Sequence, residues 1–381
     1  MIYLDNAATS FPKPPSLAAA ISEFLATEAV NPGRSGFDLG LRAGARMDEL
    51  RRRLAVFFNH PDGDSNRVVF AAGATDALNL AIQGVCRPGD HVVSTVLEHN
   101  SVLRPLFELQ KQGISHDLAP CDERGFVHPN TIEKLLRPET RLVVMTHASN
   151  VIGTIQPVAR IGEICRSRGI HFLLDTAQTA GVIPVDMAAI GADLLVFTGH
   201  KGLMGPTGCG GLLVGQNVDV RPIRWSGTGV RSAHRGHLVE YPYRLEAGTL
   251  NTVGLVGLDA GLHWLSGHDA GGIEKNLANQ ILAGITNIPK VRAVGLEKGE
   301  TDIALAGRLS VLSILIEGID PAKIGMFLDA DWDIAVRTGL QCAPLAHEAM
   351  GTVQGGTIRI SPGPFNTPAQ IDTLLEALAS F

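Results

Sequence analysis

Lys201 lies in a glycine-bearing segment that could support covalent amine chemistry. Three glycines lie within four residues of it, with Thr198 and His200 just before it. Glycine lets backbone approach a ligand closely, and desolvation in a cleft lowers a lysine pKa toward the neutral amine that forms a Schiff base. Thr198 and His200 could donate hydrogen bonds to a phosphate. A lone lysine is more often a solvated surface residue, but this combination favours a Schiff-base lysine.

Asp175 ends an apolar run 26 residues before Lys201. An acidic residue in that position is often a helix cap or a loop residue. A carboxylate against a pyridinium nitrogen keeps that nitrogen protonated and makes the ring of pyridoxal phosphate (PLP) an electron sink. The order and spacing of Asp175 and Lys201 therefore favour a PLP site.

Further polar side chains lie where predicted strands end. Ala74 and Thr75 follow Gly73 at an expected helix start, where free N–H groups attract phosphate, although a simple Thr N-cap is the plainer interpretation. His99 and Asn150 follow two other predicted strands; taken singly, such residues are usually structural caps or turn residues. Ligands of parallel sheets bind beyond the carboxyl ends of the strands. We therefore expect these side chains to share one site.

Alternating strand and helix patterns predict a parallel sheet that brings these residues together. The expected strands are Arg67–Ala72, His91–Val96, Arg141–Thr146, His171–Asp175 and Leu194–Thr198, and the expected helices are Ala74–Val85, Val102–Gln112 and Val158–Arg168. The fold class is α/β, with a large domain built on a mainly parallel seven-stranded sheet covered by helices, plus a smaller C-terminal α/β domain.

The smaller domain is expected from a second alternating block. After a helix at about 253–265, strands are predicted at Leu309–Glu317, Ile334–Thr338 and Thr357–Ser361, and helices at Pro321–Asp329 and Pro368–Ser380. We expect the large domain to span residues 15–255, and the small domain to combine residues 1–14 with 256–381.

Composition excludes several classes of protein. The chain has 381 residues, 45% of them apolar, with 32 basic and 38 acidic residues and a net charge of −6, which gives no basic footprint for nucleic acid or a membrane surface. The five cysteines are scattered without CxxC spacing, a pattern typical of a reducing compartment and not of a disulfide framework or a zinc site. No signal-peptide pattern follows Met1, so a cytoplasmic location is expected.

Several motifs resemble, in order, those of the class V (fold type I) PLP-dependent aminotransferase superfamily, and within it the cysteine desulfurases and selenocysteine lyases. They are Tyr3–Thr9, Glu98-His99, His147–Gly153, Asp175–Gln178 and Thr198–Lys201. The resemblance covers nearly the whole chain and implies fold type I and PLP as cofactor.

The resemblance also implies roles for individual residues. Lys201 binds PLP as a Schiff base and then transfers protons, Asp175 pairs with the pyridine nitrogen, and His99 stacks on the ring. Other residues are implied to contact the ring hydroxyl, the substrate region or the phosphate: Gln178, Asn150, Ala74, Thr75, Thr198 and His200. Gly248 and Thr249 match a segment that reaches the neighbouring subunit's phosphate site, which implies a homodimer with shared active sites. Leu250 stands where relatives commonly have Pro.

Cys342 indicates which reaction follows. A cysteine before a helix is most often a small core residue, and the other four cysteines fit that interpretation. Cys342 instead follows a polar glycine-bearing turn before an apparent helix start, conditions that favour a thiolate. Its segment resembles the Arg-x-Gly-x-x-Cys-Ala motif of SufS-like (group II) cysteine desulfurases, with Leu340 and Gln341 where that group commonly has two histidines. The resemblance implies a persulfide on Cys342, a small-molecule amino-acid substrate such as L-cysteine, and a protein as a candidate sulfur acceptor.

Three arginines are candidate substrate contacts. Arg359 lies on an alternating strand, where an arginine could simply be surface-exposed. By resemblance it clamps the α-carboxylate of the substrate, a role that suits the bidentate guanidinium. Arg337 is a secondary candidate; Arg34, in a Gly/Pro loop, is a third and could instead be solvated.

L-Cysteine desulfuration is thus the leading hypothesis. Selenocysteine lyase, aminotransferase and epimerase chemistry remain alternatives on the same fold. A non-catalytic, decayed scaffold is disfavoured because Lys201, Asp175 and His99 are all present.

Overall fold

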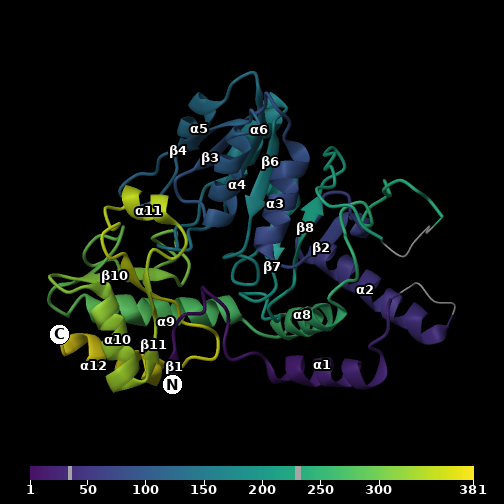
Figure 1. Ribbon diagram of the computed structural model, residues 1–381. Coiled ribbons are helices and arrows are strands. Elements are labelled where there is room, and N and C mark those ends of the chain that lie inside the picture. The colour runs from purple at the N-terminus through teal and green to yellow at the C-terminus, as the bar shows by residue number, and fades with distance from the viewer. Residues whose placement is uncertain (33–36, 228–232) are drawn as a thin grey trace.

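The computed structural model describes residues 1–32, 37–227 and 233–381. Its larger part is built on a seven-stranded sheet in the order β2-β8-β7-β6-β5-β3-β4 (Figure 1). The strands are β2 (Val68–Ala71), β3 (His91–Thr95), β4 (Ser115–Ala119), β5 (Thr140–Thr146), β6 (His171–Asp175), β7 (Leu194–Thr198) and β8 (Gly210–Val214). Only β8 runs against its neighbours, so the prediction of a mainly parallel sheet is confirmed.

Helices cover both faces of this sheet, because its strands are apolar on both sides. One buried cluster joins the sheet to α3 (Ala74–Val85) and α4 (Asn100–Gln110). The other joins it to helices that include α2 (Asp38–Phe57), α6 (Val158–Arg168) and α8 (Thr252–Leu265). Shorter helices α5 (Pro129–Leu135) and α7 (Met187–Ile190) also contribute to the second cluster, and α1 (Pro15–Thr27) packs on α8.

The smaller part contains a four-stranded antiparallel sheet in the order β12-β13-β10-β9. These strands are β9 (Val291–Ala293), β10 (Leu312–Ile316), β12 (Arg337–Gly339) and β13 (Thr357–Ile360). A separate apolar cluster packs this sheet against α9 (Ala270–Ile285), α10 (Pro321–Trp332) and α12 (Pro368–Ala379). A short helix, α11 (Pro344–Ala349), follows β12.

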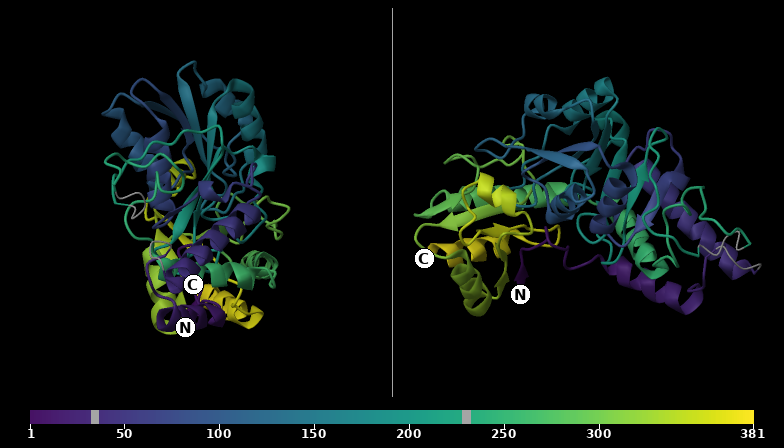
Figure 2. Two further views of the ribbon diagram at one scale, coloured as in Figure 1. Left: turned by 90° about the vertical axis from the view of Figure 1, so that its right-hand side faces the viewer. Right: turned by 45° about the horizontal axis from the view of Figure 1, so that its top comes forward.

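The N-terminus lies beside the smaller part although the chain then enters the larger one. Strand β1 (Ile2–Tyr3) pairs in parallel with β11 (Ile334–Ala335). Figure 2 shows the N-terminal segment, in purple, running from the smaller part toward α1. This pairing supports our proposal that residues 1–14 group with residues 256–381 in one domain.

One expectation about the C-terminal part was wrong, and one helix there was not predicted. The single strand expected at Ile334–Thr338 is two strands, because β11 pairs with β1 and β12 pairs with β13; a local apolar pattern does not reveal a change of partner. Helix α9 was not predicted, since Gly271 and Gly272 weaken the helical pattern at its start. In the part of the chain that the structure describes, no helix is both long and apolar enough to cross a membrane.

Candidate active site

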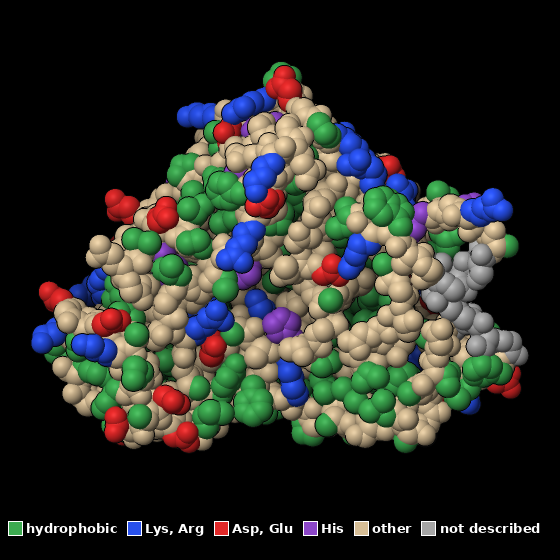
Figure 3. Space-filling view, in the orientation of Figure 1, with side chains coloured by type: hydrophobic (Ala, Val, Ile, Leu, Met, Phe, Trp, Pro, Cys, Tyr) green, Lys and Arg blue, Asp and Glu red, His purple; other side chains and the backbone are tan. Residues whose placement is uncertain are grey.

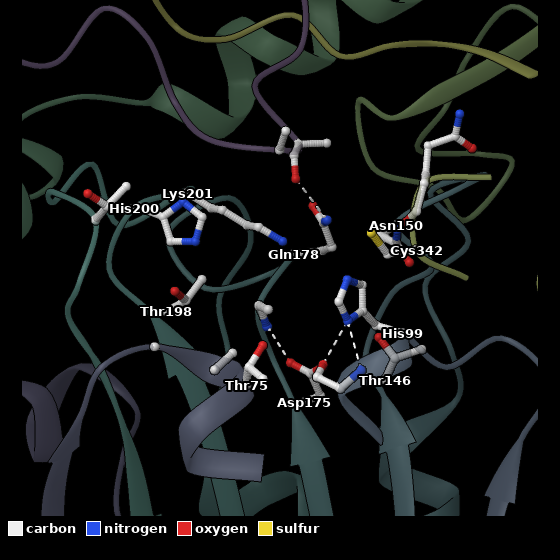
Figure 4. A pocket seen from close by; sticks show the side chains of 18 of the residues that line it. Thr75, His99, Thr146, Asn150, Asp175, Gln178, Thr198, His200, Lys201 and Cys342 are labelled. Carbon is white, nitrogen blue, oxygen red and sulfur yellow. Dashed lines mark hydrogen bonds between the residues drawn. The ribbon is translucent and has the colours of Figure 1, made fainter. Parts of the chain in front are cut away.

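A cavity of about 640 Å³ opens at the carboxyl ends of the large sheet, where segments of the smaller part also reach it (Figure 4). The expected site residues that line it are Ala74, Thr75, His99, Asn150, Asp175, Gln178, Thr198, His200, Lys201, Arg337, Cys342 and Arg359. Gly248 and Thr249 do not line it; both are exposed. Arg34 lies outside the described residues.

Lys201 projects into this cavity from a tight turn after β7. The turn requires glycine at 202, because a Cβ there would lie 2.4 Å from the Ala180 carbonyl oxygen. Figure 4 shows the Lys201 amine pointing into the centre of the cavity. Desolvation lowers the pKa of this amine to about 8, with nearby Asp175 acting in the opposite direction. A substantial fraction of the amine is therefore neutral, and nucleophilic, just above neutral pH.

Asp175 lies at the end of β6, below Lys201 in the view of Figure 4. Only 4% of its surface is exposed, and its Oδ1 accepts a hydrogen bond from the Ala177 N–H at 2.9 Å. Burial raises the pKa of the carboxyl, while the Ala177 bond and the Lys201 charge oppose that rise. A protonated ring nitrogen brought into the cavity would stabilise this buried carboxylate by its opposite charge.

His99 has a defined tautomer. Its Nδ1 caps α4 by accepting the Ser101 backbone N–H at 3.0 Å, and the Ser101 hydroxyl lies 2.7 Å away. Nδ1 is thus an acceptor, and the ring proton resides on Nε2. Burial, with the Lys201 charge next in importance, lowers the pKa of His99 to about 4. The ring is therefore neutral over the whole physiological pH range, and it lines the cavity.

One end of the cavity has polar groups that could bind an anion. Thr198 Oγ1 and His200 Nδ1 are both buried there without a hydrogen-bond partner among the described residues. Helix α3 begins beside them, and its Gly73 N-cap contributes no side chain to the free N–H groups of the first turn. Buried polar atoms and helix N-termini both need partners, and a phosphate can satisfy them together.

Gln178 and Asn150 already have partners within the protein. Gln178 Nε2 donates to the Ala7 carbonyl at 3.2 Å, and Asn150 Nδ2 donates to the Gln341 carbonyl at 2.7 Å. Their oxygens and remaining N–H groups are left for a ligand. Asn150 therefore does something that the sequence did not reveal: it fastens the Cys342 segment to the large sheet.

Cys342 lies between β12 and α11 on a segment with an unusual backbone. Gln341 has φ 41° and Cys342 φ 61°, a left-handed conformation that disfavours non-glycine residues by roughly 1–2 kcal/mol each. Side chains stabilise it: His347 Nε2 donates to Gln341 Oε1 at 2.7 Å, and Gln341 Nε2 donates to the Thr357 carbonyl at 3.3 Å. The Asn100 N–H donates to the Cys342 carbonyl at 2.8 Å.

The thiol of Cys342 differs from the other thiols of the chain. All five cysteines are free, and Cys342 alone among them is exposed. Cys86, Cys165 and Cys209 are buried, and burial raises the pKa of each thiol to about 12. Arg337 Nη2 lies 3.5 Å from the Cys342 sulfur, so a cation stands beside it. The expectation that Cys342 differs from core cysteines is confirmed; Cys121 is half-buried.

Arg359 is more enclosed than an alternating strand indicates. It is 1% exposed, and its guanidinium donates to Asp5 Oδ1 at 2.6 Å and to the Asn150 carbonyl at 2.9 Å. Burial lowers the pKa of Arg359, and Asp5 is the main opposing influence. The guanidinium still borders the cavity. A carboxylate entering the site would therefore meet an arginine whose orientation Asp5 has fixed.

The N-terminal segment supplies supports that the sequence reasoning missed. The Ser10 N–H and the Lys13 amine both donate to the His200 carbonyl, at 2.9 and 3.0 Å, and the Ser10 hydroxyl donates to the Lys201 carbonyl at 3.0 Å. These bonds hold the Lys201 turn from outside the large sheet. No local sequence pattern predicts these bonds, because the partners are 187 to 191 residues apart.

Glu98 is a second unanticipated support. Its Oε1 accepts from the Thr95 hydroxyl at 2.6 Å and the Thr146 N–H at 3.0 Å. Burial raises the pKa of Glu98 to about 8, and the Asp175 charge adds to that rise. When Glu98 is protonated, it adds no second negative charge near Asp175. Its hydrogen bonds also link the ends of β3 and β5.

Comparison with known proteins agrees with this geometry. The model of the family described as aminotransferase class-V matches residues 2–374. The chain belongs to this family. The match includes every described residue that lines the cavity.

Within the class V family the chain is similar to proteins called cysteine desulfurases. A probable cysteine desulfurase from Methanothermobacter thermautotrophicus is 34% identical over 99% of this chain and 94% of its own length. The cysteine desulfurase CsdA of Escherichia coli is 30% identical over 99% of this chain and 93% of its own. An apo structure of a cysteine desulfurase from Thermococcus onnurineus NA1 superposes with a TM-score of 0.90 at 30% identity, covering 100% of this chain and 94% of that one.

Proposed function

We propose that this class V enzyme is a PLP-dependent L-cysteine desulfurase, which converts cysteine to alanine and holds the sulfur as a persulfide on Cys342. One observation carries the proposal. An exposed cysteine with a neighbouring arginine borders the same cavity as a desolvated lysine and a buried aspartate. An aminotransferase or epimerase needs the lysine and the aspartate but has no use for the thiol.

The residues present fit PLP. Lys201 supplies the amine for the covalent link, and Asp175 the buried carboxylate for the ring nitrogen. The unpartnered Thr198 Oγ1 and His200 Nδ1, with the first turn of α3, fit the phosphate. When bound, PLP supplies an electron sink that weakens the bonds around the substrate's α-carbon.

Protein side chains would orient the substrate and move its protons. Arg359, fixed by Asp5, binds the α-carboxylate, and Arg337 is a second cation at the same edge. The Lys201 amine would accept and return the substrate's α-proton, because its lowered pKa leaves it partly neutral near pH 8. The neutral His99 ring stacks on the cofactor, and Gln178 and Asn150 direct their free amide atoms to it.

Cys342 performs the sulfur transfer. Its thiolate attacks the substrate sulfur, and the bond from that sulfur to the substrate carbon breaks with its electron pair left on the carbon side. Protonation of that carbon gives alanine as the organic product. Arg337 stabilises the thiolate by charge. The motif resemblance to SufS-like enzymes stays a prediction, because Leu340 and Gln341 replace the two histidines of that subgroup.

We further propose a homodimer in which Gly248 and Thr249 of each subunit complete the phosphate end of the other subunit's cavity. Both residues are exposed and outside their own cavity. Two apolar residues of the same part of the chain, Trp225 and Val239, are 75% and 72% exposed. Exposed apolar residues of this kind are typical of an interface seen in a single subunit. We also propose a reducing, cytoplasmic setting, because the five cysteines are scattered along the chain without CxxC spacing.

A substrate panel tests the proposal. Purified enzyme is given cysteine, selenocysteine or cysteine sulfinate with a reductant, and alanine is measured with and without the Cys342→Ser substitution. We expect alanine and sulfide in equal amounts from cysteine, and strong dependence on Cys342 for cysteine but weak dependence for selenocysteine, the better leaving group. Equal cysteine turnover by the Ser variant would refute the persulfide route and favour a selenocysteine lyase or another class V reaction.

A further inference from the structure

A second cavity shares Cys342 with the active site. Its volume is about 450 Å³, and it lies between α3 and α4, which run side by side in front of the sheet (Figure 1). Five residues border both cavities: Thr75, Asn79, His99, Ser101 and Cys342. Cys342 therefore stands at the junction of two spaces: one that holds Lys201 and Asp175, and one that leads away over the two helices.

The groove between α3 and α4 has the size and lining of a small-molecule site. Its volume falls in the range of about 300–1,000 Å³ that such sites occupy. Polar side chains of Asn79 and Gln83 line the α3 side, and the buried Pro105 and Leu109 give the α4 side an apolar floor. A groove of this volume accommodates a compact thiol.

The groove also carries an available positive charge. Arg104 is exposed in it, and among the described residues it has no hydrogen-bond or ion-pair partner. The one acidic residue of the groove, Glu108, is bonded to Lys111 at 2.6 Å. Figure 3 shows Lys and Arg side chains running down this face, over α4 and just below it. The electrostatics thus favour an anion at the Arg104 end.

We propose that this groove binds the sulfur acceptor, and that the acceptor is a low-molecular-mass thiol carrying a carboxylate. Arg104 binds the carboxylate and directs the thiolate toward Cys342. The inference rests on the proposed function, because it needs a persulfide on Cys342. It adds a second approach to the Cys342 sulfur, over α3 and α4.

The transfer is a thiol exchange that balances without an added oxidant. The acceptor thiolate forms a bond to the terminal sulfur of the persulfide, and the bond from that sulfur to Cys342 Sγ breaks. The electron pair stays on Cys342 Sγ, where Arg337 at 3.5 Å stabilises the regenerated thiolate. The products are an acceptor persulfide and the free thiolate of Cys342.

Two thiols of nearly equal size distinguish carboxylate recognition from general thiol reactivity. Enzyme is loaded with one equivalent of cysteine, freed of excess substrate, and mixed with mercaptopropionate or with mercaptopropanol. The rate at which the Cys342 persulfide disappears is measured for wild type, Arg104→Ala, Arg104→Lys and Arg141→Ala. Arg141 is an exposed arginine at the opposite end of the sheet, and it controls for the loss of one positive charge.

We expect the mercaptopropionate-to-mercaptopropanol rate ratio to fall roughly fivefold in Arg104→Ala, as for an exposed ion pair, and to fall less in Arg104→Lys. Added salt should lower the wild-type ratio in the same direction. The ratio should not change in Arg141→Ala. An unchanged ratio in Arg104→Ala overturns the acceptor site while leaving desulfuration intact. Failure of the wild type to form alanine and persulfide during loading is the different result that overturns the proposed function.

Discussion

Lys201 and Cys342 border one cavity, yet the two regions that carry them are built differently. Lys201, Asp175 and Thr198 lie at or just after the ends of parallel strands whose apolar residues are wholly buried. Cys342 lies on a short segment whose backbone is left-handed at consecutive residues. The fold itself fixes the first region, whereas a few side-chain hydrogen bonds fix the second. Damage to the first should remove cofactor chemistry, and damage to the second should remove only sulfur transfer.

The largest effect should come from Lys201→Ala. Without its amine, the enzyme loses the covalent cofactor link and the proton-transfer group, and alanine formation should fall by about 10²–10⁴-fold or more. In the wild type, borohydride should reduce the covalent link and remove the visible absorption band of the bound cofactor. In the variant, any bound cofactor should be non-covalent, and borohydride should not fix it to the protein. Lys134→Ala, at an exposed site on α5, is the matched control. Retention of a borohydride-fixed cofactor by the Lys201 variant would assign the link to another residue.

Cys342→Ser should have the next largest effect and should separate the two regions. Steady-state cysteine turnover should fall on the order of 100-fold, which is about 2.7 kcal/mol in activation free energy. The cofactor absorption spectrum should not change, because Cys342 lies outside the region at the strand ends that contains Lys201, Asp175 and Thr198. Cys121→Ser, at a half-buried site, is the control. A clear change in the cofactor spectrum of this variant would mean that the Cys342 segment and the Lys201 region are not independent.

The pH dependence of cofactor uptake should report on the strand-end region alone. The Lys201 pKa is lowered to about 8, so the neutral amine is the minor form below that pH and the major form above it. The rate of covalent cofactor attachment to apo-enzyme should rise about tenfold per pH unit below pH 8 and level off above it. Stopped-flow absorbance measures this rate. A rate that keeps rising to pH 10 would mean that the amine is not desolvated.

Gln341→Leu should have the smallest effect and should act on the second region. Leucine fits a buried position but leaves His347 Nε2 and Thr357 without their bonds, at about 1–3 kcal/mol of folding free energy. Urea unfolding of the variant should show this loss, and persulfide formation should slow several-fold while cofactor binding stays normal. Gln216→Leu, at an exposed site, controls for the added apolar surface. Unchanged persulfide formation would mean that Gln341 does not position Cys342.

The same contrast explains what could be predicted from the sequence. Helices α3 and α6 and strands β6 and β7 match their predicted bounds, because apolar periodicity and flanking glycines mark them locally. The reversal of β8, the pairing of β1 with β11 and the Asp5–Arg359 contact, 354 residues apart, have no local signal. The candidate strand-end residues were found together in one cavity because parallel strands bring their carboxyl ends to one edge.

The Cys342 segment shows where sequence reasoning stopped. The thiol could be singled out by its turn and the following helix start, but the left-handed backbone could not be predicted, since neither Gln341 nor Cys342 is glycine. Gln341 faces inward to His347 because α11 and β13 fold over it, which is a tertiary effect. Arg104 was missed because it becomes notable only beside the groove that Cys342 borders.

The most direct test of the central claim is a single turnover followed by mass analysis of the cysteine-containing peptides. Enzyme with bound cofactor is mixed with one equivalent of L-cysteine per active site, without any added reductant, and is quenched with an alkylating agent. The account predicts one alanine per active site and one added sulfur mass on the Cys342 peptide, with none on the peptides of Cys86, Cys121, Cys165 and Cys209. Alanine formed without sulfur on Cys342, or with sulfur on another cysteine, would contradict it.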